Sequence, residues 1–184
     1  GTTFMDRLKL ESTSVRTLPH LPQVGAFSLV VGNPSSGNSD WIAWRKAQIN
    51  AFVKQMYCRS LAAKPSIKVG ASVWKTSSTG RDQYLQDWDA WMLGHYIDYV
   101  CPMNYTTNNS TWTANNNDNL AHAHGRHVYA GQDTCGNTAA NSAWQVDDYL
   151  NDAGPGVSMY SRACATDSNR AELVAGPFSA TASG

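Results

Sequence analysis

The residues that could do chemistry are acids, amides, aromatic rings and an arginine, placed where predicted strands end. Asp6 and Asp133 are the two acids best placed in this way. Hydrolysis of a glycosidic bond needs two carboxyl groups that flank the bond, one of them kept protonated. We therefore take Asp6 as a candidate general acid and Asp133 as a candidate base or nucleophile. The alternatives are structural: Asp6 would be an ion-paired strand end beside Arg7 and Lys9, and Asp133 would form a turn or cap.

Other side chains at predicted strand ends suit a sugar ligand. Aromatic faces stack on pyranose rings, and amides or guanidinium groups hydrogen-bond to hydroxyls, the mixture expected of a ligand cleft. The candidates for substrate binding are Arg7, Trp74, Asn104, Tyr105, Trp112, Gln132 and Arg162. Trp74 and Trp112 are favoured as ring platforms because they lie at loop positions. The remaining tryptophans fall on helical stripes and are expected in the core: Trp41, Trp44, Trp88, Trp91 and Trp144.

We predict no cofactor and no metal. His122, His124 and His127 are close in sequence, but they straddle a helix end and a strand start, on the side opposite the expected active edge. The cysteines contain no CxxC pair, which argues against a zinc cluster. Their even number permits two disulfides in three pairings, and the alternative is that they are small buried apolar residues: Cys58, Cys101, Cys135 and Cys164.

Composition excludes several classes of function. The 14 basic and 14 acidic residues balance, so a strongly basic nucleic-acid binder is excluded. No apolar run reaches the roughly 18 residues that would indicate a membrane-spanning helix. Glutamate occurs only at Glu11 and Glu172, so a catalytic pair within the chain must use aspartate. Abundant Asn, Ser and Thr, sparse Lys and three NxS/T sequons favour a secreted or cell-envelope protein.

Apolar periodicity predicts strands that alternate with helices. The strands are expected over residues 2–10, 67–73, 96–101, 127–130 and 157–160. The helices are expected from Asp40 to Pro65 and over 85–93, 112–124, 139–152 and 167–174, with loops over 11–39 and 75–80. Strict alternation predicts an α/β fold with a parallel sheet. The last three strands start about 30 residues apart, the unit length of a (β/α)8 TIM barrel. A doubly wound sheet is the alternative, but no Gly-rich dinucleotide fingerprint follows a strand.

Several stretches resemble glycosyl-hydrolase-like family ten, whose members are predicted glycosidases on a (β/α)8 barrel. They are WIAWRKAQINAFV (41–53), IKVGASVW (67–74) and DYVCPMNYT (98–106). The opening MDRLKL resembles the fourth strand of that family, with Leu10-Glu11 where a proline is usual. The resemblance implies a single partial TIM-barrel domain over residues 1–184, with strands four to eight. Asp6 would end strand four and Asp133 strand seven.

These observations predict a glycoside hydrolase that acts on a polysaccharide, which the resemblance implies is of cell-wall or amino-sugar type. The main alternative is a non-catalytic carbohydrate-binding barrel, because glutamate is scarce and the second carboxylate is ambiguous. A third interpretation is a fragment or assembly component. Since 184 residues are too few for eight βα units, we expect a second chain or further residues to complete the barrel.

Overall fold

A computed structural model describes residues 35–179 of the chain. The predicted strand over residues 2–10, with Asp6 and Arg7, lies outside the described residues. The chain divides into two compact units, Gly1–Trp44 and Arg45–Gly184, and the sheet belongs to the second. None of the helices within residues 35–179 has the length and apolar character that crossing a bilayer would require.

The long helix α2 (Ser39–Ala63) begins one residue earlier than predicted and ends before Pro65 as predicted. Asn38 provides the cap, because its Oδ1 accepts a hydrogen bond from the Trp41 amide at 2.9 Å. Asp40 instead lies inside the first turn, where a negative charge is favourable. The apolar side chains of α2 are covered only in part, because Phe52 and Met56 are 63% and 46% exposed.

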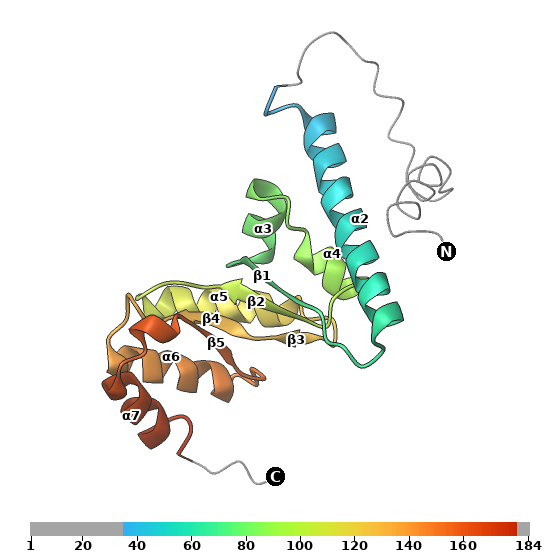
Figure 1. Ribbon diagram of the computed structural model, residues 1–184. Helices are drawn as coiled ribbons and strands as arrows, with labels where there is room; N and C mark the ends of the chain where they lie inside the picture. The colour runs from blue at the N-terminus through green and yellow to red at the C-terminus, as the bar shows by residue number, and fades with distance from the viewer. Residues whose placement is uncertain (1–34, 180–184) are drawn as a thin grey trace. The chain divides into compact units, whose positions relative to one another are not determined.

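The strands within residues 35–179 form one parallel sheet in the order β1-β2-β4-β5, with β3 also paired to β2 (Figure 1). The strands are β1 (Gly70–Trp74), β2 (Tyr99–Met103), β3 (His127–Val128), β4 (Ala130–Asp133) and β5 (Val157–Tyr160). The connecting elements are α3 (Ser77–Gln83), α4 (Trp88–Leu93), α5 (Asn109–Ala121), α6 (Ala139–Asn151), the short 3₁₀-helix η2 (Arg162–Cys164) and α7 (Asp167–Ala175). The prediction of an α/β fold with a parallel sheet is confirmed.

Local signals explain most element boundaries. Thr138 caps α6 by accepting a hydrogen bond from the Asn141 amide at 3.2 Å, and Thr166 forms a capping box with Asn169 at the start of α7. Several predicted boundaries were wrong, and two examples show why. The segment 75–80 is not a loop throughout, because Thr76 caps the short helix α3. The strand expected over 67–73 starts only at Gly70, and Val73 alone is buried in it.

The core lies between the sheet and the helices that cover one of its faces. One cluster joins the strands to α4 through Val73, Trp88, Trp91, Met92, Ile97, Val100 and Val128. A smaller cluster joins Trp112 of α5 and Tyr149 of α6 to Ala130 of β4. Successive strand residues point to opposite faces, so Trp74, Tyr99 and Cys101 face away from these helices. They are half-buried, so the second face of the sheet remains partly accessible.

Asp98, at the amino end of β2, is a structural acid. It is 6% exposed, and its carboxylate accepts hydrogen bonds from the Val69 amide at 2.8 Å and from Arg126 at 3.1 Å. The hydroxyl of Tyr57 donates a third bond at 3.3 Å. The buried charge is therefore paired and hydrogen-bonded, which is the condition for an acid to be tolerated in a protein interior.

The burial of Tyr149 predicts that the protein becomes less stable at alkaline pH. Its side chain is 1% exposed and its hydroxyl donates to the Val128 carbonyl at 2.6 Å. Burial raises the pKa of Tyr149 above its ordinary value. The unfolded chain therefore loses this proton at lower pH than the folded chain, and the free energy of unfolding should fall as pH rises past about 10.

We expect the urea midpoint of the wild type to fall as pH rises above about 10, and that of Tyr149→Phe to fall less. Tyr84→Phe, at a tyrosine that is 45% exposed, is the control. Equal pH profiles for wild type and Tyr149→Phe would contradict this account.

Candidate functional site

The carboxyl ends of β1, β2, β4 and β5 share one edge of the sheet (Figure 1). The register aligns Trp74 with Met103 and Asp133 with Tyr160. The sequence predicted that side chains at strand ends would gather in this way, because parallel strands end on the same side. This edge is the candidate site.

Two tyrosines form an accessible aromatic surface at this edge. Tyr105, just after β2, stacks on Tyr160 at the end of β5, with ring centroids 5.5 Å apart and planes 20° apart. They are 41% and 59% exposed. Partial burial, and then the neighbouring Tyr160 and Asp133, raise the pKa of Tyr105. Its hydroxyl therefore stays protonated at neutral pH and can donate a hydrogen bond.

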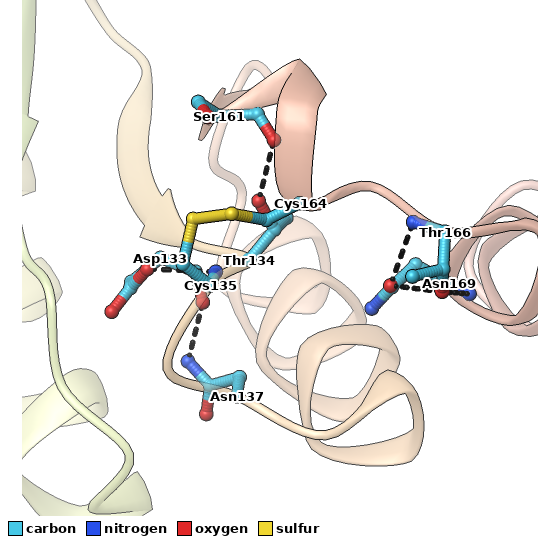
Figure 2. The surroundings of a disulfide bond; sticks show 8 residues. All are labelled: Asp133, Thr134, Cys135, Asn137, Ser161, Cys164, Thr166 and Asn169. Carbon is cyan, nitrogen blue, oxygen red and sulfur yellow. Dashed lines mark hydrogen bonds between the residues drawn. A yellow bond between two sulfur atoms is a disulfide. The ribbon is translucent and has the colours of Figure 1, made fainter.

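Asp133 lies at the carboxyl end of β4 and makes a turn. Its Oδ1 accepts a hydrogen bond from the Cys135 amide at 2.8 Å, as the structural alternative predicted (Figure 2). Its Oδ2 has no hydrogen-bond partner among residues 35–179. A Cβ atom on Gly136 would lie 2.5 Å from Oδ2, so a larger residue at position 136 would shift the Asp133 carboxyl group. One oxygen thus fixes the turn and the other is available to a ligand.

A disulfide joins the segments that follow β4 and β5. It links Cys135 to Cys164 over a sequence separation of 29 (Figure 2). Beside it, Thr134 donates from its amide to the Tyr160 carbonyl at 2.8 Å and from its hydroxyl to the Ser161 carbonyl at 3.0 Å. The sequence left the pairing open, and the structure assigns this pair. The cross-link and the Thr134 bonds hold Asp133 and Tyr160 in one rigid wall.

Trp74 and Arg162 complete the accessible part of the predicted set. Trp74 ends β1, is half-buried and packs against Tyr84, with ring centroids 4.1 Å apart and planes tilted by 45°. Arg162 lies in η2 and is exposed. Both are within reach of solvent at the carboxyl ends of their strands, where the sequence placed them.

The prediction of direct contact with the substrate is wrong for three residues, because their side chains are fully buried. Trp112 is 0% exposed because α5 starts at Asn109, which puts the tryptophan on the inner side of its first turns. Asn104 is also 0% exposed and donates to the Trp112 carbonyl and to Asn116, both at 3.1 Å. Gln132, equally buried, donates to Ser142 at 3.0 Å. These side chains fix helices α5 and α6 to the strand ends.

Tyr160 lies at the candidate site but was not among the site residues predicted from the sequence. It ends the predicted strand 157–160, so its position at the carboxyl edge was readable. Its contact with Tyr105, which lies 55 residues earlier in the chain, could not be predicted from the sequence.

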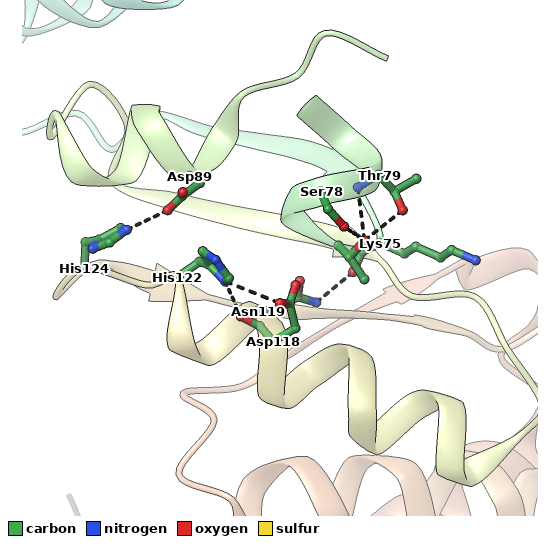
Figure 3. A network of polar contacts seen from close by, with 9 residues as sticks. Lys75, Ser78, Thr79, Asp89, Asp118, Asn119, His122 and His124 are labelled. Atoms are coloured by element: carbon green, nitrogen blue, oxygen red, sulfur yellow. Dashed lines mark hydrogen bonds and ion pairs between the residues drawn. The ribbon is translucent and has the colours of Figure 1, made fainter. Parts of the chain in front are cut away.

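His122 and His124 each contact an oxygen of an aspartate residue (Figure 3). His122 Nδ1 lies 2.6 Å from the Asp118 carbonyl, and His124 Nε2 lies 2.6 Å from Asp89 Oδ1. Asn119 donates to the Lys75 carbonyl at 3.0 Å and so ties α5 to the residue after β1. Among residues 35–179, no three His, Cys, Asp or Glu side chains are grouped as metal ligands would be.

The chain is a parallel α/β protein with aromatic rings and a carboxylate at the carboxyl ends of its strands, which is where parallel α/β folds commonly bind ligands. The model of the family described as glycosyl hydrolase-like 10 matches residues 23–132, and the chain belongs to this family. No curated protein matches the chain. Membership indicates a glycosidase-related function. The matched range includes Trp74 and Tyr105, whereas Asp6, Asp133 and Arg162 lie outside it.

Proposed function

We propose that this protein is an O-glycoside hydrolase that acts on a polysaccharide of amino-sugar or cell-wall type. Asp6 is the general acid and Asp133 the base or nucleophile. The observation that carries the proposal is the accessible Tyr105–Tyr160 stack beside Asp133 at the carboxyl edge. An aromatic surface next to a carboxylate oxygen without a hydrogen-bond partner among residues 35–179 suits a pyranose ring held for attack at its anomeric carbon.

The scaffold in this proposal is a (β/α)8 barrel whose strands four to eight belong to a single domain over residues 1–184. Within residues 35–179, β1 and β5 are the outer strands of the sheet, and each is hydrogen-bonded to one neighbouring strand only. Helices cover one face of the sheet. Both features are expected of a barrel segment. Further residues or a second chain would close the barrel.

Each accessible residue has a defined part in the proposed reaction. Tyr105 and Tyr160 stack on a sugar ring, and Trp74 and Arg162 contact neighbouring sugars. The protonated Tyr105 hydroxyl donates a hydrogen bond to a sugar oxygen. Asp133 uses Oδ2, while Oδ1 keeps the carboxyl group oriented through Cys135. The disulfide supports an oxidising compartment, so we also propose a secreted or cell-envelope location.

A non-catalytic carbohydrate-binding protein is the second candidate. The observation that favours it is the Cys135–Asp133 hydrogen bond, because a carboxylate that forms a turn already has a structural role. In that case the aromatic surface would bind sugar without hydrolysis.

The proposal predicts that Asp133→Asn and Asp6→Asn each lower the release of reducing ends from glycol chitin or peptidoglycan by about 10²–10⁴-fold. Binding of the same polymer should change little, because asparagine keeps the shape of the side chain. Asp152→Asn, at the exposed carboxyl end of α6, is the matched control and should hydrolyse normally.

Full activity in Asp133→Asn would remove Asp133 from the mechanism. A wild-type protein that binds these polymers and releases no reducing ends would favour the second candidate.

A further inference from the structure

Helices α5 and α6 line an open hollow of about 540 Å³ that the candidate site does not include. Its lining consists of Asn109, Ser110, Thr113, Ala114, Asn117, Trp144 and Asp148. Trp144 is 44% exposed, although the sequence predicted it in the core. The accessible indole of Trp144 lies among small polar side chains in this hollow.

The hollow is built from fixed walls. The Thr113 hydroxyl donates to Asp148 Oδ2 at 2.8 Å and joins the two helices across it. At one end, Gln145 donates to Asn109 Oδ1 at 3.3 Å and to the Thr106 carbonyl at 2.9 Å. A ligand would therefore meet a preformed surface, which reduces the entropy lost on binding.

The lining also carries polar groups with spare hydrogen-bonding capacity. Within the described part of the chain, the side chains of Ser110 and Asn117 make no hydrogen bond, and Asp148 uses only Oδ2. These groups offer a hydroxyl, an amide and a carboxylate oxygen around the Trp144 ring. An aromatic plane with such a polar rim matches a pyranose, which has an apolar face and hydroxyls at its edge.

Charge narrows the class of ligand. No lysine or arginine lines the hollow, and its single charge is the carboxylate of Asp148. Phosphate-bearing or other anionic polymers would meet no cation and would be repelled. The surface therefore suits a neutral polysaccharide.

We infer that this hollow, the α5–α6 groove, is a second carbohydrate-binding site for a neutral polysaccharide. It starts at the first turn of α5, four residues after Tyr105, and Asn109 to Asn117 spans about 12 Å of helix. Because Gln145 bonds both Asn109 and the Thr106 carbonyl, the groove adjoins the loop that carries Tyr105. One long polysaccharide chain can therefore bind in the groove with one part and at the carboxyl ends of the strands with another part.

Affinity electrophoresis of the full chain tests this inference, with glycol chitin and hydroxyethylcellulose as neutral polymers in the gel. We expect at least one of them to retard the wild type, and Trp144→Ala to weaken that binding at least about fivefold, or about 1 kcal/mol. Asn117→Ala should weaken it to a smaller extent. Trp144→Phe, which keeps an aromatic face, should recover part of the loss. Phe52→Ala, which removes an exposed ring from α2, is the matched control.

A second measurement separates the groove from the proposed active site. Trp144→Ala should hydrolyse a short chromogenic oligosaccharide at the wild-type rate, since a short substrate does not reach the groove. Trp144-dependent binding by a protein without hydrolysis would support the groove and reject the proposed activity. Equal retardation of wild type and Trp144→Ala, or no retardation of the wild type by either polymer, would overturn the inference.

Discussion

Replacing Asp98 by alanine is expected to lower the free energy of unfolding by about 3–5 kcal/mol. The change removes the acceptor that holds the Val69 amide, the Arg126 guanidinium and the Tyr57 hydroxyl together at the amino edge of the sheet. Arg126 would keep its charge with a side chain only 25% exposed. Removal of one partner from a buried pair leaves the other charge uncompensated, which costs more than the pair contributed.

Urea denaturation followed by far-ultraviolet circular dichroism measures this change. Lys68→Ala is the control, because Lys68 Nζ lies 4.0 Å from the same carboxylate but its side chain is 76% exposed. That exposed ion pair should contribute no more than about 1 kcal/mol. A loss below about 1 kcal/mol in Asp98→Ala would show that the buried network is not important for stability.

Element types could be predicted from the sequence because local signals agreed with the final packing. The strand 157–160 and the helix that starts at Ala139 were predicted at these residues, since turn residues and an apolar period mark both. The helix α3 was missed because its residues are polar and its signal is a single cap, Thr76. A capping residue without an apolar stripe is only a weak signal for a helix in a sequence.

The two tryptophans at positions 112 and 144 show how helix phase decides a site prediction. Trp144 lies two residues from both Ser142 and Val146, which are buried, so it lies about 200° around the helix from each. Residues two apart on a helix do not share a face, so the sequence could have placed Trp144 outside. Trp112 was misplaced because the cap at Asn108 was not recognised, although its Oδ1 accepts the Thr111 amide at 2.8 Å.

The candidate site was predictable in its location but not in its contacts. Parallel strands bring their carboxyl ends to one edge, so Trp74, Tyr105 and Asp133 were expected there. Which of these side chains touch depends on register and on the segments beyond the strands. The alignment of Asp133 with Tyr160 is a long-range feature of strand pairing that no local signal predicts. The disulfide beyond these residues was one of the pairings that the four cysteines left open.

Removal of the disulfide by Cys135→Ser with Cys164→Ser is the second large effect that we expect. A cross-link over a separation of 29 restricts the unfolded chain, and its loss should lower the free energy of unfolding by about 3–4 kcal/mol. Urea denaturation under non-reducing conditions measures the loss. Cys58→Ser, at an exposed free thiol, is the control and should change stability by no more than about 0.5 kcal/mol. An unchanged midpoint in the double variant would contradict the prediction.

The same double variant separates the two constraints on the proposed active site. Thr134 still donates to the Tyr160 and Ser161 carbonyls when the disulfide is absent, so Asp133 and Tyr160 should keep their register in the folded protein. Hydrolysis at a temperature well below unfolding should therefore fall less in the double serine variant than when Thr134→Val is added to it. Equal activity with and without Thr134→Val would show that the hydroxyl contact to Ser161 does not position the site.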